Sequence, residues 1–335
     1  MLVAAVGDVH GRFFRVEEWI DALEQSRGER VAAVLCVGDV ETFATPDDHR
    51  RKATKRAMPA EFAAYATGER EMSRPFYFVG GNNESFEELD LMPDGGELAP
   101  KVTYLGRAGV RAVEGLQVGY LSGIYAPTRY MRPRVPACNA ETNKQAGYFR
   151  KDDVDAACAI PGADLLLLHE WPRGIAGMES AVAVVGARGI RRAHWPQVGN
   201  PYAALLVTRL RPPWVLCGHI HVPHAASLYW DNGETTRVAC LIDSICQAEF
   251  AETLRRIARD LIVDSTYALN PVAKYPPGVV VEVNHRRLQI CSTEGQTDCD
   301  YTVAPDGTSV TINRNPPGPE DEVEIYFVIE ESDAG

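Results

Sequence analysis

The sequence lacks the cysteine patterns that mark structural zinc sites and disulfide frameworks. None of its eight cysteines forms a C-x-x-C pair, and several lie inside apolar runs, where a free thiol behaves as a small hydrophobic group. A structural zinc is therefore not expected, and Cys291 with Cys299 is the candidate pair for a single bridge.

Long apolar runs are also missing. No uninterrupted run is long enough to cross a bilayer. The first residues, MLVAAVGDVH, reach a polar turn too early for a signal peptide, which needs a basic start and an apolar middle. We therefore expect a cytoplasmic protein with no membrane partner.

A third absence is an excess of basic residues. The formal net charge is −12, from 34 basic and 46 acidic residues. Proteins that coat nucleic acids nonspecifically neutralise phosphates with a basic surface, so this charge argues against that class. Any polyanion that the protein binds must therefore contact a local patch of basic residues. No internal repeat or low-complexity tract is present.

The chain does contain short apolar runs rich in Val, Leu and aromatic residues, whose length and composition suit buried strands. Between the first two runs, Val16, Ile20 and Leu23 repeat at helical spacing, and Gly28 is placed to end the helix. A strand, a helix and a second strand predict a βαβ unit, and so an α/β fold with a partly parallel sheet. The runs lie at 2–6, 31–37, 76–79, 116–121, 165–168, 214–217 and 238–242, and a further helix is predicted over 62–66.

The character of the chain changes near residue 250. A helical pattern through 254–262 is followed by short β-like pieces at 279–283, 288–291, 309–312 and 323–329. We expect one main domain over 1–250 and, over 251–335, a helix plus a β-rich extension. Within the first domain, residues 125–160 are rich in Pro, Arg, Asn and Gln, and connections of this length are more often functional than idle. We call residues 125–160 the recognition segment.

Polar clusters follow five of the predicted strands. Because the carboxyl ends of parallel strands meet at one edge of a sheet, where α/β proteins collect their ligand-binding loops, we expect these clusters to converge. They are Gly7-Asp8-Val9-His10-Gly11, Gly38-Asp39, Gly81-Asn82-Asn83-Glu84, His169 at the end of LLLLH, and Gly218-His219-Ile220-His221.

The residue types in these clusters indicate a metal centre. In an extended chain, residues two apart point the same way, so Asp8 with His10, and His219 with His221, can each present two ligands together. Carboxylate, imidazole and amide groups suit Mn, Fe or Zn. Asp39 could bridge two ions about 3.5–4 Å apart, an arrangement used for displacement at phosphorus. Each motif is common by chance, but five in this order, each at a strand end, are not.

The order D-x-H, GD, GNx, H, GHxH resembles the calcineurin-like metallophosphoesterase superfamily, whose fold is a β-sandwich flanked by helices. Within the superfamily, residues 1–250 are similar to RNA lariat debranching enzymes. The stretches that carry this similarity are AYATGE (65–70), FVGGNNES (78–85), LAPKVTYLGRAGV (98–110), YLSGIYAPTRY (120–130), GYFRKDDV (147–154), DLLLLHEWPRGI (164–175) and CGHIHVPHAASL (217–228).

The resemblance implies a centre of two divalent ions, Mn, Fe or Zn. It would place Asp8, His10, Asp39 and His221 around one ion, and Asp39, Asn82, His169 and His219 around the other. The implied activity is hydrolysis of a 2′–5′ or related nucleic-acid phosphodiester, with RNA as the substrate. A hydroxide held by the ions would attack phosphorus in line with the leaving oxygen.

Two residues depart from the debranching pattern. Eukaryotic debranching enzymes typically have Cys where this chain has Asp8, so a full two-metal centre is favoured here. Where the family has a His that helps to protonate the leaving group, this chain has Asn83. An amide can contact a phosphate oxygen but cannot titrate, and a general acid is typically worth about 10²–10⁴ in rate. His224 and His194 are candidate replacements.

In the debranching enzymes, the segment that corresponds to the recognition segment contacts the branched RNA. Arginine and aromatic side chains suit stacking on bases and binding to phosphates. The predicted contacts are Tyr125, Arg129, Tyr130, Arg132 and Arg134. The alternative is a solvated loop whose arginines pair with the many acids. Glu84 and Glu170 are candidates for hydrogen bonds to metal ligands, and the basic clusters at 49–56 and 188–192 are interpreted as solvated faces.

Other functions remain open at this stage. A phosphodiesterase of the same fold that acts on another nucleotide or small diester is favoured by Asn83 and by the acidic charge. A non-catalytic scaffold has no need for every predicted ligand. A protein serine/threonine phosphatase is disfavoured because Gly38-Asp39 continues as Val-Glu-Thr-Phe rather than as that group's Asp-Arg-Gly pattern. No protein partner is predicted.

Overall fold

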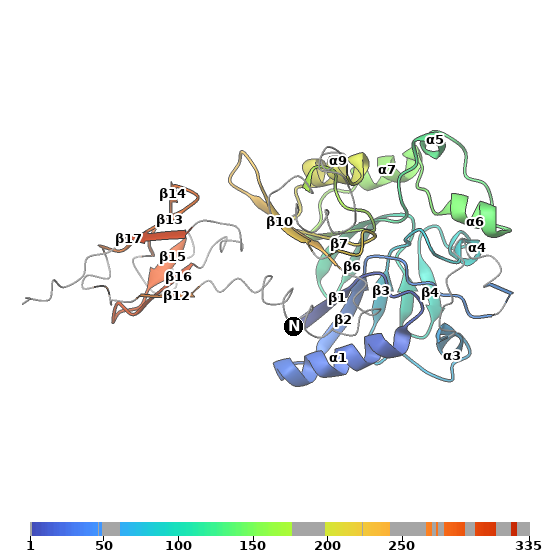
Figure 1. The fold of residues 1–335 in the computed structure, drawn as a ribbon, viewed down its shortest axis with the longest axis horizontal. Coiled ribbons are helices and arrows are strands. Elements are labelled where there is room, and N and C mark those ends of the chain that lie inside the picture. The colour runs from blue at the N-terminus through green and yellow to red at the C-terminus, as the bar shows by residue number, and fades with distance from the viewer. Residues whose placement is uncertain are drawn as a thin grey trace, which may run out of the picture. The chain divides into compact units, whose positions relative to one another are not determined.

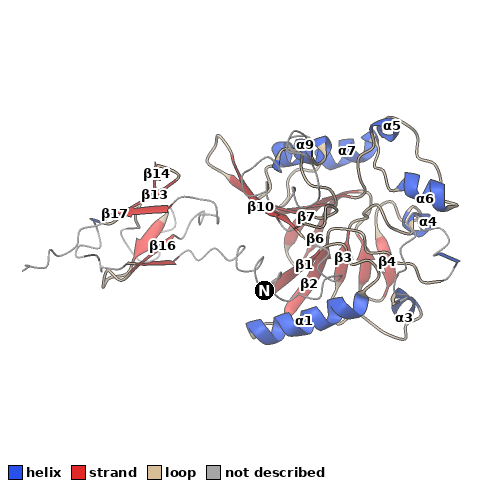
Figure 2. Ribbon diagram, viewed as in Figure 1, coloured by secondary structure: helices blue, strands red, loops and turns tan. Residues whose placement is uncertain are grey.

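The computed structural model describes residues 2–45, 47–48, 61–175, 198–222, 224–241, 266–269, 273, 278–291, 299–312 and 323–326. The chain divides into two compact units, Met1–Leu254 and Arg255–Gly335, which are described separately (Figures 1 and 2). Every predicted metal ligand and the whole recognition segment belong to the first unit.

The first sheet of this unit has five strands in the order β1-β2-β3-β5-β4. Neighbouring strands are parallel except for β4, which is antiparallel to β5 at the edge. Helix α1 (Phe13–Arg27) covers one face and buries Phe13, Val16 and Ile20 in the first hydrophobic core (Figure 1). The strands are β1 (Leu2–Val6), β2 (Val31–Cys36), β3 (Phe76–Phe78), β4 (Gly96–Ala99) and β5 (Val102–Tyr104), and two short helices, α3 (Phe62–Ala66) and α4 (Phe86–Leu89), lie in the connections.

The second sheet has six strands in the order β10-β11-β9-β8-β7-β6. Its four inner strands are parallel, and β6 and β10 are antiparallel edge strands. Helices α7 (Lys151–Cys158) and α9 (Pro201–Leu210) pack on it through Val154, Ala157 and Leu206 in a second core. The strands are β6 (Ala108–Val113), β7 (Leu116–Leu121), β8 (Leu165–Leu168), β9 (Trp214–Cys217), β10 (His224–Tyr229) and β11 (Thr235–Cys240).

The two sheets meet at the ends of their parallel strands. The N–H of Gly123, just after β7, donates to the carbonyl of Gly80, just after β3, at 2.6 Å. Each sheet has helices on its outer side (Figure 1). The arrangement confirms the predicted α/β fold, a β-sandwich flanked by helices.

The predicted βαβ unit is confirmed. Helix α1 ends at Gly28, whose backbone is left-handed with φ of 63° and whose N–H donates to the carbonyl of Glu24 at 2.8 Å. Glycine adopts this conformation without the steric cost that a Cβ would add. β1 and β2 then pair in parallel over their whole length.

The recognition segment is more regular than its sequence predicts, because it contains three short helices. These are α5 (Pro127–Tyr130), α6 (Ala140–Ala146) and α7. α6 begins with a capping box in which the Asn139 side chain accepts from the N–H of Thr142. Local side-chain hydrogen bonds thus order a stretch that has no hydrophobic periodicity.

The second unit contains two three-stranded sheets in its described part, in the orders β12-β16-β15 and β14-β13-β17. They share a small core around Val281, Tyr301 and Val310, and Cys291 and Cys299 form a disulfide. The strands are β12 (Thr266–Ala268), β13 (Val280–Val283), β14 (Arg286–Arg287), β15 (Tyr301–Val303), β16 (Ser309–Ile312) and β17 (Val323–Tyr326). The predicted helix over 254–262 and the basic cluster at 49–56 lie outside the described residues.

One predicted strand of this unit is wrong. Residues 288–291 do not form a strand; β14 is Arg286–Arg287, and Ile290 makes a single bridge to Tyr301. Asn284 and His285 both have left-handed backbone, with φ of 50° and 64°, and form the tight turn of a hairpin. Pairing with β13 therefore begins directly after the turn.

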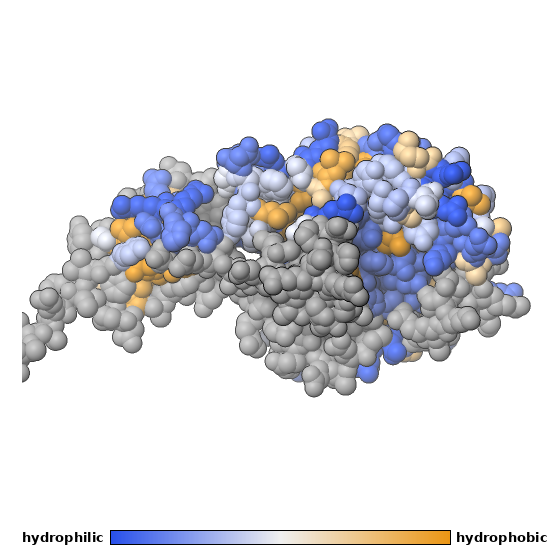
Figure 3. Space-filling view, turned by 45° about the horizontal axis from the view of Figure 1, so that its top comes forward, coloured by the Kyte–Doolittle hydropathy of each residue, from blue (hydrophilic) through white to orange (hydrophobic). Residues whose placement is uncertain are grey.

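Among the described residues, no helix is both long and apolar enough to cross a membrane. On the face drawn in Figure 3, hydrophobic residues of the described part form separate small areas in a mainly hydrophilic surface. Large apolar side chains that are exposed include Leu91, Met131 and Leu205. Most other large apolar side chains of the described part are buried in the cores.

Candidate metal centre

The predicted ligands follow the carboxyl ends of five parallel strands. Asp8 and His10 follow β1, Asp39 follows β2 and Asn82 follows β3 in the first sheet. In the second sheet, His169 follows β8, and both His219 and His221 follow β9. The topology therefore brings all seven predicted ligands to the edge where the sheets meet.

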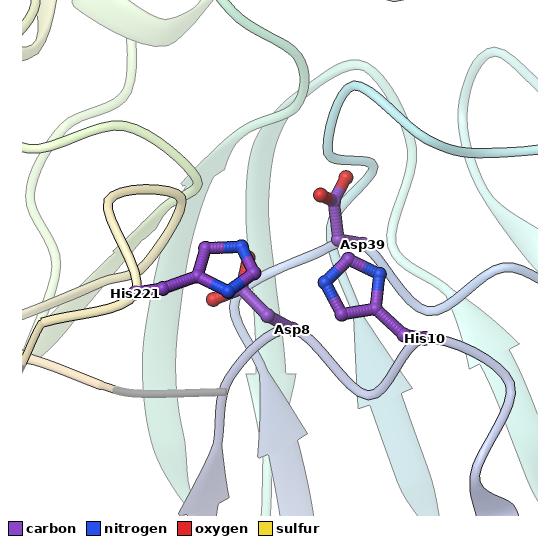
Figure 4. A group of neighbouring side chains, drawn as sticks. All are labelled: Asp8, His10, Asp39 and His221. Carbon is purple, nitrogen blue, oxygen red and sulfur yellow. The ribbon is translucent and has the colours of Figure 1, made fainter. Parts of the chain in front are cut away.

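One group of ligand atoms comes from Asp8, His10, Asp39 and His221 and lies within 4.8 Å of one another (Figure 4). His221 Nε2 lies 3.6 Å from Asp8 Oδ1, and the rings of His10 and His221 are stacked with centroids 5.2 Å apart. Two carboxylates and two imidazoles form a donor set that suits a borderline divalent cation. These are the four residues that the resemblance implies around one ion.

A second group adjoins the first and shares Asp39 with it. His169 Nε2 lies 3.2 Å from Asn82 Oδ1 and 3.5 Å from Asp39 Oδ1. The ring of His219 meets the ring of His169 edge-on, with centroids 5.0 Å apart. The residues implied around the second ion are thus linked through His169, which is close to Asp39, Asn82 and His219.

Hydrogen bonds behind two of the histidines orient their rings. His169 Nδ1 lies 2.8 Å from the carbonyl of Val37. A carbonyl can only accept, so Nδ1 carries the proton and the Nε2 lone pair faces Asn82 and Asp39. His10 Nδ1 lies 2.6 Å from the Glu41 carboxylate, and both side chains are buried. Such bonds fix the tautomer and raise the basicity of a ligating imidazole.

The backbone of the ligand loops is left-handed at several residues that carry large side chains. Of eleven described non-glycine residues with positive φ, six lie here: Asp8, His10, Asp39, Glu41, His219 and His221. Their φ values run from 43° to 71°. The expected extended D-x-H and H-x-H geometry is therefore wrong, because tight left-handed turns bring each pair of ligands together. Strained backbone of this kind persists where the surrounding fold fixes it, and it clusters at functional sites.

Glycines at the strand ends let the loops approach the ligands closely. A Cβ at Gly81 would lie 2.2 Å from Asp39 Oδ1 and 2.8 Å from His169 Cε1. A Cβ at Gly38 would lie 2.7 Å from His169 Nδ1, and one at Gly218 would lie 2.6 Å from Asp8 Oδ2. The space that side chains would fill is occupied by the ligands themselves.

The ionisation of the site suits metal binding. Burial alone would raise the pKa of Asp39, but His169, His10 and His219 hold it well below its ordinary value. Burial lowers the pKa of His169, and it lowers the pKa of His219 to about 4. Carboxylates that are ionised and imidazoles that are neutral are the forms that bind cations. The chemistry of the donor set therefore fits the divalent ions that the sequence predicts.

Asn83 faces the shared carboxylate. Its Nδ2 donates to Asp39 Oδ2 at 2.6 Å, and the N–H groups of Asn82 and Asn83 donate to Asp39 Oδ1 at 2.7 and 2.8 Å. The carboxylate is thus fixed by three donors from one turn. In this structure the Asn83 amide orients a predicted ligand.

The two acids predicted to bond the ligands accept from main-chain N–H groups and, in Glu170, from the side chain of Asn200. Glu84 accepts from the N–H groups of Val40, Glu41 and Gly81, and burial raises its pKa to about 7. Glu170 accepts from the N–H of Tyr125 and the side chain of Asn200, and burial likewise raises its pKa to about 7. Both hold the ligand loops to their neighbours. Glu41 does contact a ligand side chain, that of His10, and its signal in the sequence is its place two residues after Asp39.

The recognition segment packs on the loop that carries Asn82. The buried Asn143 of α6 donates through Nδ2 to the carbonyl of Glu84 at 2.7 Å. At Gly147, after α6, an added Cβ would lie 3.5 Å from the Cα of Asn82. The segment and the metal centre are therefore neighbours in space.

The five predicted contact residues of this segment differ in their surroundings. Tyr125 and Tyr130 belong to an aromatic cluster with Phe149 and Tyr202, the last of which was missed from the sequence. Arg134 instead donates to Asp153 at 2.5 Å and to the carbonyl of Ala146. These bonds support a structural role for Arg134, whereas Arg132 is exposed and Arg129 is partly exposed.

The structure does not bring His224 into the ligand group. His224 opens β10, is 7% exposed, and stacks on Trp171 with centroids 5.3 Å apart. Burial lowers its pKa. Its setting is that of a core residue of the second sheet. His194, the other candidate acid, and the arginines at 188–192 lie outside the described residues.

Comparison with known proteins agrees with this geometry. A family model described as calcineurin-like phosphoesterase matches residues 1–223. The chain is 32% identical over 243 residues to the lariat debranching enzyme of Danio rerio, 29% over 247 residues to that of Homo sapiens, and 28% over 239 residues to lariat debranching enzyme A of Xenopus laevis.

These matches cover 70%, 71% and 69% of this chain, but only 43%, 45% and 45% of the relatives. The matched region therefore spans less than half the length of each of these three relatives. The family model covers most of the unit that holds the metal centre. On the family match and on the donor groups around Asp39, this chain belongs to the calcineurin-like phosphoesterase family.

Proposed function

We propose that this chain is a metal-dependent phosphodiesterase that hydrolyses a 2′–5′ or related phosphodiester in RNA. The observation that carries the proposal is the position of Asp39, which belongs to the group with Asp8, His10 and His221 and whose Oδ1 also lies 3.5 Å from Nε2 of His169. A single structural cation needs only the first group, whereas the proposal uses His169 with Asn82 and His219 for a second ion. Similarity to proteins named lariat debranching enzyme supports a branched RNA as the substrate.

The donor groups suit two ions of Mn, Fe or Zn. Asp8, His10, Asp39 and His221 would hold one, and Asp39, Asn82, His169 and His219 the other. Two bound ions would polarise the phosphoryl oxygens, lower the pKa of water, and offset charge on the attacking and leaving oxygens. The amide of Asn82 is a neutral donor, so it leaves more positive charge on its ion than a carboxylate would.

The protein supplies orientation around this chemistry. Glu41 and the carbonyl of Val37 fix the rings of His10 and His169. Asn83 has two roles in the proposal: it orients Asp39, and its amide contacts a phosphate oxygen once substrate is present. Since an amide does not titrate, protonation of the leaving oxygen falls to solvent or to a residue other than Asn83.

Arginine and aromatic groups on the recognition segment support a nucleic-acid substrate. Arg129, Arg132, Tyr125 and Tyr130 lie on the recognition segment, which packs on the loop of Asn82. Guanidinium and aromatic side chains bind phosphates and stack on unpaired bases, which is how single-stranded or branched RNA is recognised. The net charge of −12 is compatible with this because the contact is local.

A second candidate is a phosphodiesterase of the same type that acts on another nucleotide or a small diester. Asn83 favours it, since the loss of a general acid matters least where the leaving group is activated. The two candidates share the metal centre and differ in substrate size.

The decisive experiment compares three substrates on protein reconstituted with Mn, Fe or Zn. These are a branched 2′–5′ RNA, a linear 3′–5′ RNA and an activated small diester. Preferential cleavage of the branched RNA supports the first candidate, whereas turnover of the activated diester alone supports the second. Asp39→Asn should abolish every activity, and Asp231→Asn, an exposed pair with Arg211, is the matched control that should not. The absence of turnover of all three substrates with every metal would contradict both candidate functions.

A further inference from the structure

Tyr202 joins α9 to the recognition segment. Its ring stacks on Tyr130, with centroids 4.1 Å apart and planes 22° apart. The same ring meets Tyr125 edge-on at 5.1 Å and Phe149 edge-on at 6.2 Å. Phe149 is fully buried in the core of the second sheet. The cluster therefore ties an exposed turn to the interior of the molecule.

The turn that Tyr202 contacts is short. Helix α5 has four residues, and the N–H groups of Arg129 and Tyr130 both donate to the carbonyl of Ala126. A helix of this length is not stable through its own hydrogen bonds. Its position depends on side-chain packing, and the stack of Tyr130 on Tyr202 supplies such packing. Arg129 is the residue before Tyr130, so its position follows from the same stack.

Glu170, which follows the predicted ligand His169, bonds both the segment that carries Tyr130 and the helix that carries Tyr202. Glu170 Oε2 accepts from the N–H of Tyr125 at 2.6 Å and from Nδ2 of Asn200 at 2.7 Å. Asn200 is buried and caps α9, with its Oδ1 accepting from the N–H of Tyr202 at 2.8 Å. One carboxylate next to His169 thus holds the start of the recognition segment and the start of the helix that carries Tyr202.

We infer that Tyr202 is a positioning residue that makes the enzyme select a polynucleotide over a small diester. Its ring fixes α5, and with it Arg129 and Tyr130, at a set place on a segment that is bonded to the residue after His169 and, through α6, to the loop of Asn82. From that place they contact a strand that extends beyond the scissile phosphate. The inference rests on the proposed function for the identity of that strand. A small diester has no strand that reaches α5, so its hydrolysis should not depend on Tyr202.

The test uses the full chain with Tyr202→Ala, the conservative Tyr202→Phe, and Leu205→Ala as a control on the exposed side of the same helix. Three quantities are measured: amide hydrogen exchange at Arg129, Tyr130 and Arg132, the Kd for a fluorescent branched RNA oligonucleotide in Ca²⁺, and kcat/KM for an activated small diester. We expect Tyr202→Ala to speed exchange and raise the Kd about 3- to 10-fold, the worth of one aromatic pair. Diester turnover and Leu205→Ala should match the wild type. Tyr202→Phe keeps the ring but loses the hydroxyl that bonds the side chains of Tyr125 and Tyr130, so its exchange and Kd should lie between those of the wild type and of Tyr202→Ala.

Unchanged exchange in Tyr202→Ala overturns the inference, and so does an equal loss on the diester or a wild type that does not bind the oligonucleotide. Failure of the proposed function looks different. In that case the wild type binds the oligonucleotide without cleaving it in Mn, Fe or Zn, while Tyr202→Ala still weakens binding and loosens α5. The two ideas can therefore fail separately.

Discussion

Replacing Gly81 by Ala should disable the metal centre. An added Cβ would lie 2.2 Å from Asp39 Oδ1, 2.4 Å from the Asp39 backbone nitrogen and 2.8 Å from His169 Cε1. Favourable contacts between heavy atoms are about 3.5–4 Å long, so something must move by on the order of 1 Å. The obstacles are backbone and two predicted ligands, not the far end of a flexible side chain.

The cost of this change follows from what must move. Overpacking a close-packed site costs typically about 1–3 kcal/mol. Displacing the Asp39 carboxylate also weakens its bonds from the N–H groups of Asn82 and Asn83, each worth about 1.5–3 kcal/mol as a bond to a charged group. A total loss of about 3 kcal/mol or more would lower the melting temperature by roughly 6–12 °C for a unit of this size.

Thermal denaturation followed by circular dichroism, together with metal content by mass spectrometry, measures both effects. Gly162→Ala is the matched control, because an added Cβ there meets nothing within 4 Å. It should leave metal content unchanged and keep or slightly raise the melting temperature. A Gly81→Ala protein that melts with the wild type and binds the same metal with the same affinity would refute the reasoning.

Three further predictions concern residues around the centre. Glu41→Gln removes the charged partner of His10 and should weaken metal binding about 10- to 100-fold in a calorimetric titration; wild-type affinity would contradict the orienting role. Asn83→His restores a group that can titrate and should speed cleavage of branched RNA by up to about 10²-fold, with little gain on an activated diester; equal gains on both substrates would speak against a missing acid. Asn143→Ala removes the buried hydrogen bond to the carbonyl of Glu84 and should lower the free energy of unfolding by about 1–3 kcal/mol, measured by urea denaturation. An unchanged midpoint would show that this bond does not support the loop.

Most of the parallel strands of both sheets could be predicted because of how they are buried; the short β5 was not predicted. Parallel strands covered on both faces read as continuous apolar runs, and the runs at 2–6, 116–121, 165–168 and 214–217 have the same bounds in the structure. β6 and β10 lie at sheet edges, and their sequences AGVRAV and HAASLY carry polar and small residues. Such strands leave no apolar run, so they were missed.

That the candidate ligands lie at one edge could be predicted for a similar reason. They follow strands that were themselves visible, in an order that few proteins share. Their backbone conformation could not be predicted, since nothing in D-x-H says that both residues adopt left-handed φ. Tyr202 was missed because its partner Tyr130 is 72 positions earlier in the chain, and only the packing of α9 on the second sheet brings the two rings together.

The left-handed backbone at the metal centre also bears on whether the site is in use. A non-glycine residue in this conformation costs roughly 1 kcal/mol or more, and six residues of the site adopt it. In a chain with no need for the centre, glycine at any of these positions would relieve that strain, so drift in a pure scaffold should run toward glycine. All six positions instead hold Asp, Glu or His, the side chains that bind cations or orient those that do. The six residues thus keep a strained backbone together with side chains that a metal centre needs, which is expected of a working site and not of an idle one.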